Sequence, residues 1–320
     1  MKTIKKLLTL IICLAMVLPL TACTGNKVAG KKIGILQLVT HPALDACTEG
    51  VVSKLGELGI TKENSTIDIQ NANGDTSLAN TIAQKFVTDK VDVIVAIATP
   101  AAQAAYTAIQ GTDIKVVFIA VSDPVAAGLV KDLNTPVENV TGVTDVLDVA
   151  AEVDLVKVLM PEASTVGVIY NTGEANSVVQ VKDLEEATTK NNLKLEKVAI
   201  TNTSEIAAGL DTLMSKCDVV INVLDNTVVS AIDLEIAKSL EHKTPVIGSE
   251  DGQVGKGALA SNGFDYKAIG EQTAPMVVDV LSGKTVKIEN AKKTQATVNK
   301  TTAKKLNIDI TKLKDATIVE

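Results

Sequence analysis

Acidic and amide side chains gather in three loops of the second half of the chain, each directly after a short apolar run. The loops are residues 171–177 (NTGEANS), 225–227 (DNT) and 250–251 (ED). Carboxylates in such loops can pair with an ammonium group, and Asp225 and Glu250 are the best candidates for that role. Each of these two acids could instead cap a helix or lie in a hinge. The first interpretation predicts that this half of the chain binds a cationic group.

The corresponding loops of the first half offer hydrogen-bond donors instead. Pro42, Pro100 and Pro124 each follow an apolar run closely, and proline is favoured at the first position of a helix. Thr99 is a good cap for a helix that starts at Pro100. The free N–H groups of that first turn, together with the helix dipole, favour an anion such as a carboxylate. An ordinary capped helix is the alternative. Donors in one half and acids in the other together predict a site for a zwitterion.

These loops belong to an internal repeat. Residues 32–123 and 165–251 run through the same order of apolar runs and helical segments, and Asp92 in the first corresponds to Asp218 in the second. A repeat of this length builds two similar lobes, and two similar lobes form a cleft. We therefore expect one lobe to supply the donors of the site and the other lobe to supply its acids.

The loops must be held in place by alternating strands and helices. The strands are short, rich in Val and Ile, and apolar at nearly every position, which indicates burial on both faces of a parallel sheet. Each half is therefore predicted to be a doubly wound α/β domain, in which ligands bind beyond the carboxyl ends of the strands. The predicted strands are 33–38, 91–98, 116–121, 166–170, 219–223 and 246–248. The predicted helices are 42–58, 77–89, 100–110, 148–159, 177–190, 203–215 and 227–241.

The chain continues beyond the two halves with a further strand, a helix and a last strand. The simplest arrangement returns the further strand and the helix to the first lobe and ends in the second, which gives three crossings between the lobes. The three segments are 257–261, 265–281 and 294–299, and the crossings fall near 123–139, 248–257 and 283–290. The predicted domains are 32–124 plus 256–284 for the first lobe and 125–255 plus 285–320 for the second.

Residues 1–22 form a predicted signal peptide. Three lysines precede an apolar stretch, residues 7–18, that is too short to span a bilayer. Residues 20–23 read Leu-Thr-Ala-Cys, which is a lipobox, so cleavage before Cys23 would leave residues 23–31 as a lipidated tether. An uncleaved membrane anchor, the alternative, needs about 20 apolar residues. The mature chain is expected on the extracytoplasmic face of the cell membrane, held there by lipid (palmitate) on Cys23.

Composition argues against several classes of function. The net charge is −7 before the three lysines of the signal peptide are removed, and no Arg is present. Nucleic-acid binding and guanidinium clamps are therefore not expected. Motifs of hydrolases, phosphate-binding loops and zinc proteases are absent from the sequence, and its two His have no ligand spacing, so we expect no enzyme, no cofactor and no metal. Cys47 and Cys217 are expected to be small buried residues without a disulfide.

Six segments, in this order, closely resemble one family. They are IGILQLVTHPALDACTEGV, VIVAIATPAAQAA, FIAVSDPVAAGLV, GVIYNTGEANSVVQV, LDNTVVSA and GSEDGQVGKGALAS. The family is that of the substrate-binding lipoproteins of ABC importers, of the tryptophan/tyrosine type, and the similarity spans residues 32–309.

The resemblance implies a type I periplasmic-binding-protein fold, with two Rossmann-like lobes joined by three hinge strands that close like a flytrap on an amino acid. The ligand is expected to be aromatic (tyrosine, tryptophan or phenylalanine), and the partners are an ABC permease and an ATPase that receive it from a monomer. Tyr106, Tyr170 and Phe264 are the candidates for stacking on the ligand ring. Carried over by position, the ligand-binding residues are Gln37, His41, Thr99, Ser122, Asp123, Asn171, Asn176, Ser177, Asp225, Asn226 and Glu250.

A surface sensor or adhesin lipoprotein with the same ligand-binding fold is the alternative function. The lipobox suits both functions equally. Neighbouring genes for a permease and an ATPase would favour import, and a neighbouring sensor kinase would favour signalling.

Overall fold

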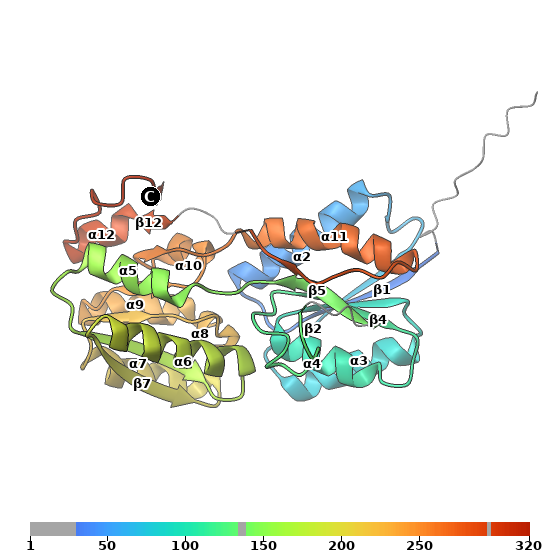
Figure 1. Cartoon of the computed structure of the whole chain (residues 1–320), viewed down its shortest axis with the longest axis horizontal. Helices are drawn as coiled ribbons and strands as arrows, with labels where there is room; N and C mark the ends of the chain where they lie inside the picture. The colour runs from blue at the N-terminus through green and yellow to red at the C-terminus, as the bar shows by residue number, and fades with distance from the viewer. Residues whose placement is uncertain (1–29, 134–138, 293–295) are drawn as a thin grey trace, which may run out of the picture.

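A computed structural model describes residues 30–133, 139–292 and 296–320. The predicted signal peptide and Cys23 lie outside these residues. The described chain forms two α/β lobes side by side, with the first half of the sequence mainly in one lobe and the second half mainly in the other (Figure 1). None of the described helices combines the length and the apolar content that a membrane crossing needs.

The first lobe is built on a six-stranded parallel sheet in the order β11-β5-β4-β3-β1-β2. Helices α2 and α11 pack together on one face of this sheet, and α3 and α4 pack together on the other (Figure 1). The strands are β1 (Lys32–Gln37), β2 (Thr66–Asn71), β3 (Val93–Ile97), β4 (Lys115–Ile119), β5 (Val140–Thr144) and β11 (Glu289–Asn290). The helices are α2 (Pro42–Glu57), α3 (Thr76–Thr88), α4 (Thr99–Ala108) and α11 (Tyr266–Leu281).

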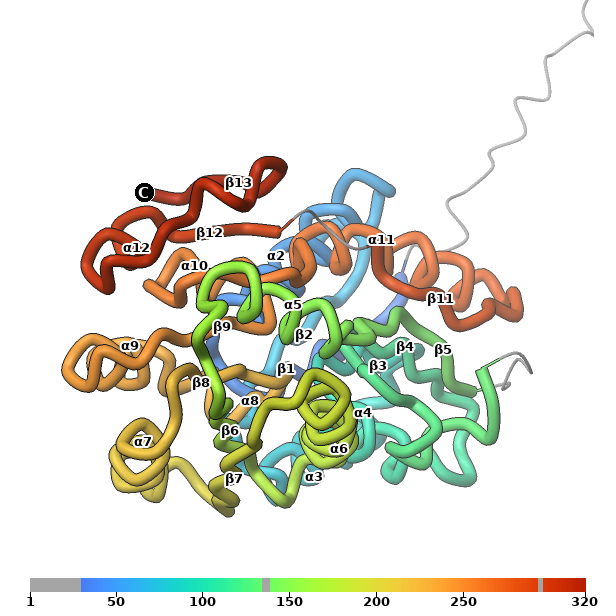
Figure 2. Tube along the Cα trace, turned by 60° about the vertical axis from the view of Figure 1, so that its left-hand side comes forward, coloured from blue at the N-terminus to red at the C-terminus, as the bar shows by residue number. Residues whose placement is uncertain are grey.

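The second lobe is built on a seven-stranded sheet that runs from β13 at one edge to β7 at the other, in the order β13-β12-β10-β9-β8-β6-β7 (Figure 2). All neighbouring strands are parallel except β10 and β12. The strands are β6 (Thr165–Asn171), β7 (Lys194–Ile200), β8 (Val219–Ile221), β9 (Val246–Gly248), β10 (Ala260–Ser261), β12 (Thr297–Asn299) and β13 (Thr317–Val319). The helices are α5 (Val149–Leu159), α6 (Ala175–Lys190), η1 (Thr203–Glu205), α7 (Ile206–Met214), α8 (Asn226–Val229), α9 (Ile232–His242), α10 (Asp251–Lys256) and α12 (Lys300–Leu306).

The internal repeat is visible in matching hydrogen bonds. Asp92 accepts a bond from the backbone N–H of Lys32, 2.8 Å long, at the start of β1. Asp218 accepts one from the N–H of Thr165, 2.9 Å long, at the start of β6. The two aspartates thus fix the first strand of each lobe in the same way, and the predicted α/β class with two parallel-sheet lobes is confirmed.

Two strands lie in a different lobe from the one that the predicted bounds gave them. β5 belongs to the first sheet although it falls within 125–255, and β10 belongs to the second although it falls within 256–284. β5 reads VTGVT, which is less apolar than the neighbouring strands, while β10 continues the second sheet beside β9. The placement of 257–261 in the first lobe is therefore wrong. The crossings lie instead between β5 and α5, between β10 and α11, and between β11 and β12.

Each lobe has its own core, and α2 and α11 approach closely within the first. Cys47 lies in this core and Cys217 beside a core of the second lobe, both as free thiols. Two glycines allow the helix contact: a Cβ on Gly50 would overlap the carbonyl oxygen of Lys267, and one on Gly270 would overlap that of Cys47. Because both obstacles are backbone atoms, a side-chain movement cannot relieve the overlap.

Gly50→Ala is therefore expected to lower the free energy of unfolding by about 1 to 3 kcal/mol, the usual cost of overpacking a core. Gly56→Ala is the matched control, because Gly56 lies in the same helix with open space around its Cβ position. That control should be neutral or stabilising by up to about 1 kcal/mol through helix propensity. Urea unfolding of both variants checks this, and equal stability of the two would contradict the packing argument.

Candidate functional site

A narrow cavity lies between the lobes. The first lobe contributes His41, Ala43, Leu44, Ala120, Ser122, Asp145 and Tyr266. The second contributes Asn176, Leu224, Asp225, Asn226, Val229, Glu250 and Gln253.

The topology of the two sheets explains why these side chains meet. Ser122 and Asp145 lie in the loops that follow β4 and β5 in the first lobe, and Asp225 and Glu250 lie in those that follow β8 and β9 in the second. All four residues therefore follow the carboxyl ends of parallel strands, where α/β folds place their ligands. The two lobes turn these ends toward one cavity, as the repeat predicted.

Asp225 is both a helix cap and a wall of the cavity. One carboxylate oxygen accepts a 2.9 Å hydrogen bond from the N–H of Val228 in α8, and the other accepts a 2.6 Å bond from the N–H of Asn171. The side chain is almost completely buried. Burial, followed by the charge of the neighbouring Glu174, raises the pKa of Asp225 to about 7. A cation in the cavity would favour the ionised form of this group.

Glu250 has the same double role at the start of α10. Its carboxylate accepts a 2.5 Å hydrogen bond from the N–H of Gly252, while the other oxygen, Oε1, is buried without a protein partner. Burial raises the pKa of Glu250 to about 7. The two interpretations of these acids, cap and site residue, are thus compatible, because one carboxylate can cap a helix and still border the cavity.

Asp145, which the sequence did not single out, adds a third carboxyl group from the first lobe. It accepts hydrogen bonds from the Ser122 hydroxyl (3.0 Å) and from the Tyr266 hydroxyl (2.8 Å). Burial raises its pKa to about 6, although both of these hydrogen bonds act in the opposite direction. Ser122 and Tyr266 are therefore oriented by Asp145 at the wall of the cavity.

The helix N-termini that border the cavity differ between the lobes. In the second lobe, α8 and α10 are capped by the side chains of Asp225 and Glu250. In the first lobe, α2 has no side-chain cap, and Ala43 and Leu44 in its first turn line the cavity. The first N–H groups of a helix have no partner within it, so this end of the 16-residue helix can receive an anion.

His41 and Asn226 connect the lobes at the cavity. His41 Nε2 lies 3.3 Å from Asn226 Oδ1, and burial lowers the pKa of the imidazole. Buried polar atoms without a protein partner remain at three lining residues: His41 Nδ1, Asn176 Oδ1 and Glu250 Oε1. Because buried polar atoms are normally hydrogen-bonded, these atoms indicate that a polar ligand or water completes the site.

Apolar side chains line the rest of the cavity. Leu44, Ala120, Leu224 and Val229 give it an aliphatic wall, and Tyr266 is its aromatic lining residue. The aromatic residues predicted from the sequence do not line the cavity. Phe264 packs edge-on against Tyr266, with 6.4 Å between the ring centroids. Tyr106 packs against the core of the first lobe, and Tyr170 against a core of the second.

Six of the predicted site residues line the cavity, namely His41, Ser122, Asn176, Asp225, Asn226 and Glu250. The other five do not line it. Gln37 bonds Val39, Asp45 and Thr48, Asp123 caps the turn at Val125, and Asn171 bonds Thr227. Ser177 contacts Asn176 and Asp225 from the buried side. Thr99 is the first residue of α4, and Ala98 occupies the cap position instead. The uncapped helix at the cavity is therefore α2 and not α4.

Some residues of the site were missed by sequence reasoning. Asp145 follows β5, which was not recognised as a strand, and Tyr266 comes from the late helix α11. Gln253 lies within 248–257, where the sequence predicts a crossing between the lobes. Among the described residues, no group of three or more His, Cys, Asp or Glu is placed to hold a metal ion.

Residues 32–317 match the model of a family described as ABC transporter substrate binding protein. A tyrosine-binding protein from Clostridioides difficile is 40% identical over 322 residues, which cover 95% of this chain and 93% of that protein.

Two solved structures are similar over 91% of this chain. One is an ABC domain in complex with L-Trp from Streptococcus pneumoniae, with 35% identity, a TM-score of 0.87 and 100% of that chain covered. The other is the ligand-free, open structure of a substrate-binding protein with adhesive properties from Clostridium difficile, with 42% identity, a TM-score of 0.68 and 99% covered. The chain thus superposes better on the ligand-bound structure than on the open one, although its sequence is closer to the open one.

Proposed function

The chain belongs to the family of ABC transporter substrate-binding proteins, and from this membership we propose that it captures one aromatic amino acid between its lobes for import. The observation that carries the proposal is the cavity itself. An uncapped helix end faces it from one lobe and buried carboxyl groups from the other, with three unpartnered polar atoms between them. The three crossings of the chain act as the hinge on which the lobes close.

The asymmetry of the two lobes orients the ligand. The α-carboxylate accepts hydrogen bonds from the first-turn N–H groups of α2, where the helix dipole also favours an anion. The ammonium group lies toward Asp225 and Glu250, whose carboxylates prefer a nearby cation. The side chain of the ligand packs against the aliphatic wall and Tyr266. In the second lobe, the N-termini of α8 and α10 are already capped by the carboxylates of Asp225 and Glu250. These charges exclude the opposite orientation, in which the ligand carboxylate would lie beside them.

The relatives support an aromatic ligand. One is a tyrosine-binding protein and another holds L-Trp, and both are similar over nearly the whole chain. We propose tyrosine as the first candidate, because the tyrosine-binding protein is 40% identical to this chain and the L-Trp-bound protein is 35% identical.

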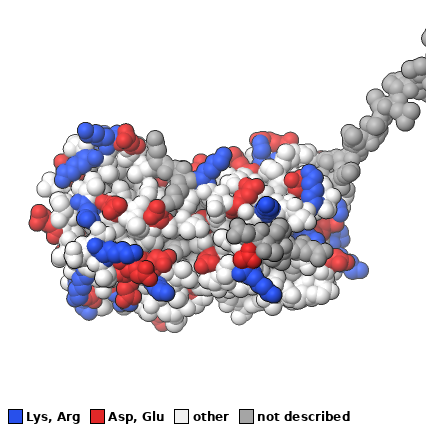
Figure 3. Space-filling model, viewed as in Figure 1, with Lys and Arg blue, Asp and Glu red and all other residues white. Residues whose placement is uncertain are grey.

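The proposed place of action is the outer face of the cell membrane. The lipobox before Cys23 and the polar residues after it support a lipid anchor. A monomer held there would release its ligand to an ABC permease driven by an ATPase. On the face seen in Figure 3, Lys side chains are interspersed with Asp and Glu, which does not favour nucleic acid as a partner.

A thermal-shift screen of the ligand-stripped protein against the twenty amino acids tests the proposal. A ligand that binds only the folded state raises the melting temperature, by an amount equivalent to about 2.7 kcal/mol at a hundred times its Kd. We expect tyrosine, tryptophan or phenylalanine to give the largest shift. The absence of a shift with all three would contradict the proposal.

The carboxyl groups of the cavity predict a pH dependence of ligand binding. The pKa is about 6 for Asp145 and about 7 for Asp225 and Glu250 in the folded protein, whereas such groups ionise near pH 4 when unfolded. Between these values the empty folded state holds protons that the unfolded state has lost, so these groups lower the free energy of unfolding as pH rises from about 4 to 7.

A ligand ammonium group reverses this effect because it favours the ionised carboxylates. Binding is therefore expected to release about one proton near pH 6.5 and to tighten as pH rises from 5 to 8. Calorimetric titrations in buffers with different ionisation enthalpies measure the released protons. Proton uptake, or an affinity that falls as pH rises over this range, would show that the ammonium group does not lie beside these acids.

The adhesin alternative has one specific observation in its favour, the similarity to a substrate-binding protein with adhesive properties. Adhesion would use the outer surface and leave the cavity free. Binding of the protein to a cell surface, measured with and without a saturating amino acid, tests this alternative: adhesion through the outer surface predicts equal binding in both conditions, and no binding in either contradicts it.

A further inference from the structure

Glu174 is a buried carboxylate that does not line the cavity, yet it organises residues that do. It lies at the cap position of α6, but its side chain accepts no hydrogen bond from the backbone N–H groups of that helix. Its Oε1 accepts hydrogen bonds from Thr227 N (2.9 Å) and Thr227 Oγ1 (2.8 Å). Its Oε2 accepts bonds from Asn226 N (3.1 Å), Asn226 Nδ2 (2.6 Å) and Asn176 Nδ2 (3.3 Å). Glu174 therefore fixes the start of α8 from outside.

These bonds determine the direction of the Asn226 amide. Carboxylate oxygens only accept hydrogen bonds, so the amide group that faces Glu174 must be the NH₂ and the oxygen must point away. That oxygen lies 3.3 Å from Nε2 of His41, which belongs to the other lobe. Since an amide oxygen only accepts, the proton of a neutral His41 must be on Nε2, and Nδ1 keeps its lone pair.

The side chain of His41 can contact the other lobe because, like that of Glu174, it does not cap its own helix. It occupies the cap position of α2 without bonding that helix through its side chain. The lobes also approach closely next to it, because a Cβ on Gly252 of α10 would come within 2.8 Å of Pro42 Cβ. The contact between His41 and Asn226 thus lies where the lobes meet, at the edge of the cavity.

We propose that Glu174, Asn226 and His41 form a latch that is made when the lobes close, and that Glu174 is its positioning residue. Glu174 itself does not line the cavity. It holds the Asn226 oxygen ready for His41, and closure of the lobes completes the bond. This inference rests on the proposed function, because a latch matters only if ligand binding closes the lobes. The closer superposition on the L-Trp-bound relative than on the open one supports a closed arrangement here.

The first test reads the imidazole directly by ¹⁵N NMR of the histidine-labelled protein with tyrosine. The chain has only two His, so the spectrum is simple. His41 is expected to titrate in the free protein, and to be held as the Nε2–H tautomer without titrating when ligand is bound. Glu174→Gln should remove this fixed tautomer, because a glutamine can face Asn226 with either its oxygen or its NH₂ group.

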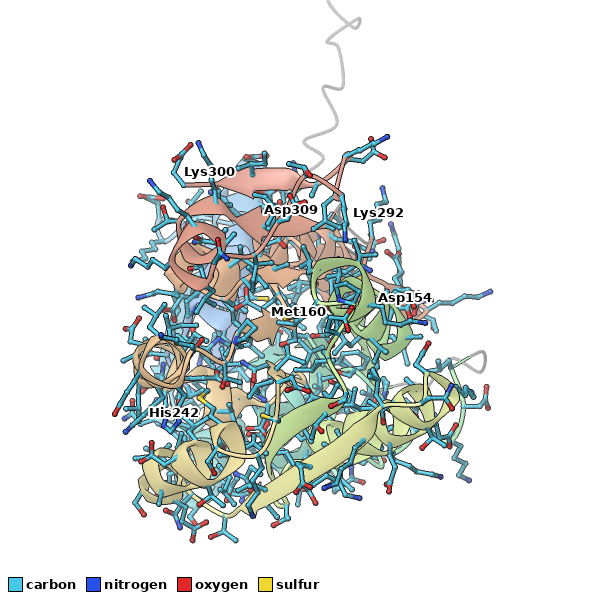
Figure 4. All side chains as sticks on the ribbon, turned by 90° about the vertical axis from the view of Figure 1, so that its left-hand side faces the viewer. Asp154, Met160, His242, Lys292, Lys300 and Asp309 are labelled. Carbon is cyan, nitrogen blue, oxygen red and sulfur yellow. The ribbon has the colours of Figure 1, made fainter. Side chains whose placement is uncertain are left out.

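His242 is the internal control for this measurement. It lies at the end of α9 at the margin of the second lobe (Figure 4), where its Nε2 contacts Asp211 Oδ1 at 3.1 Å. Its signal should be the same in the wild type and in Glu174→Gln. The variant His242→Gln assigns the two signals.

The second test separates the latch from a general effect on the fold. Glu174→Gln is expected to weaken tyrosine binding by about 2- to 10-fold, the value of one hydrogen bond. In a His41→Ala background the same change should have almost no effect on affinity, because the latch is already lost. Any loss of α8 stability would remain in both backgrounds and so cancel in the comparison.

The outcomes are distinct. An equal loss of affinity in both backgrounds, or a His41 tautomer that does not differ between the free and bound protein, overturns the latch. Failure of the wild type to bind any aromatic amino acid overturns the proposed function itself.

Discussion

Asp225→Asn is expected to weaken binding of the amino acid by about 30- to 5,000-fold. The change keeps the shape of the side chain but removes the negative charge that faces the ammonium group. Loss of one partner of a buried ion pair costs about 2 to 5 kcal/mol, because the other charge stays buried and unpaired. Calorimetric titration at pH 7.5 measures the loss, since the higher pH keeps the wild-type carboxyl ionised.

Asp218→Asn is the matched control for this variant. Asp218 is also an aspartate that accepts hydrogen bonds from backbone N–H groups, those of Ser164 and Thr165, but it lies at the opposite end of β6 from the cavity. Its replacement should lower stability by about 1 kcal/mol and leave affinity unchanged. If both variants bind as tightly as the wild type, Asp225 is a helix cap and nothing more.

Val229→Phe is expected to weaken binding by about 5- to 150-fold without unfolding the protein. Val229 lines the cavity from α8, so a phenyl ring at this position would occupy the space of the ligand side chain. An overpacked site costs about 1 to 3 kcal/mol, which corresponds to this range. Titration with tyrosine measures the affinity, and thermal unfolding without ligand measures the fold.

The neighbouring residue gives the opposite expectation. Val228 packs in a core of the second lobe with Ile169 and Ile232 rather than in the cavity. Val228→Phe should therefore lower the free energy of unfolding by about 1 to 3 kcal/mol while the remaining folded protein keeps its affinity. If Val229→Phe binds tyrosine normally, the ligand side chain does not occupy this part of the cavity.

The central strands could be predicted because they are buried on both faces and apolar throughout. This pattern is seen in β1, β3, β4, β6, β8 and β9. The internal repeat could be predicted as well, and the matching hydrogen bonds of Asp92 and Asp218 mark it in the structure. The buried apolar pattern does not predict the edge strands β2 and β7, because their residues are partly exposed and their sequences alternate in polarity. β5 was missed for a related reason, since two Thr and a Gly interrupt its apolar residues.

The site was predictable where strand ends were predictable. Asp225 and Glu250 follow recognised strands, whereas Asp145 follows an unrecognised one. The role of Glu174 depends on its contacts with Asn226 and Thr227, which lie in another loop far along the sequence. Sequence spacing does not show that these two loops meet. The prediction that Thr99 caps a helix was wrong. A Thr before a Pro is a good cap by type, but the chain turns at Ala98, with φ of 83°, so the helix begins one residue earlier.

The most direct test of the account compares tyrosine with two analogues that each lack one charge. Tyramine has no carboxylate, and 3-(4-hydroxyphenyl)propionate has no ammonium group. We predict that one tyrosine binds per chain and that each analogue binds at least about 30-fold more weakly, because each leaves one lobe without its partner. Binding of either analogue as tightly as tyrosine would show that the two lobes do not hold opposite charges of one ligand.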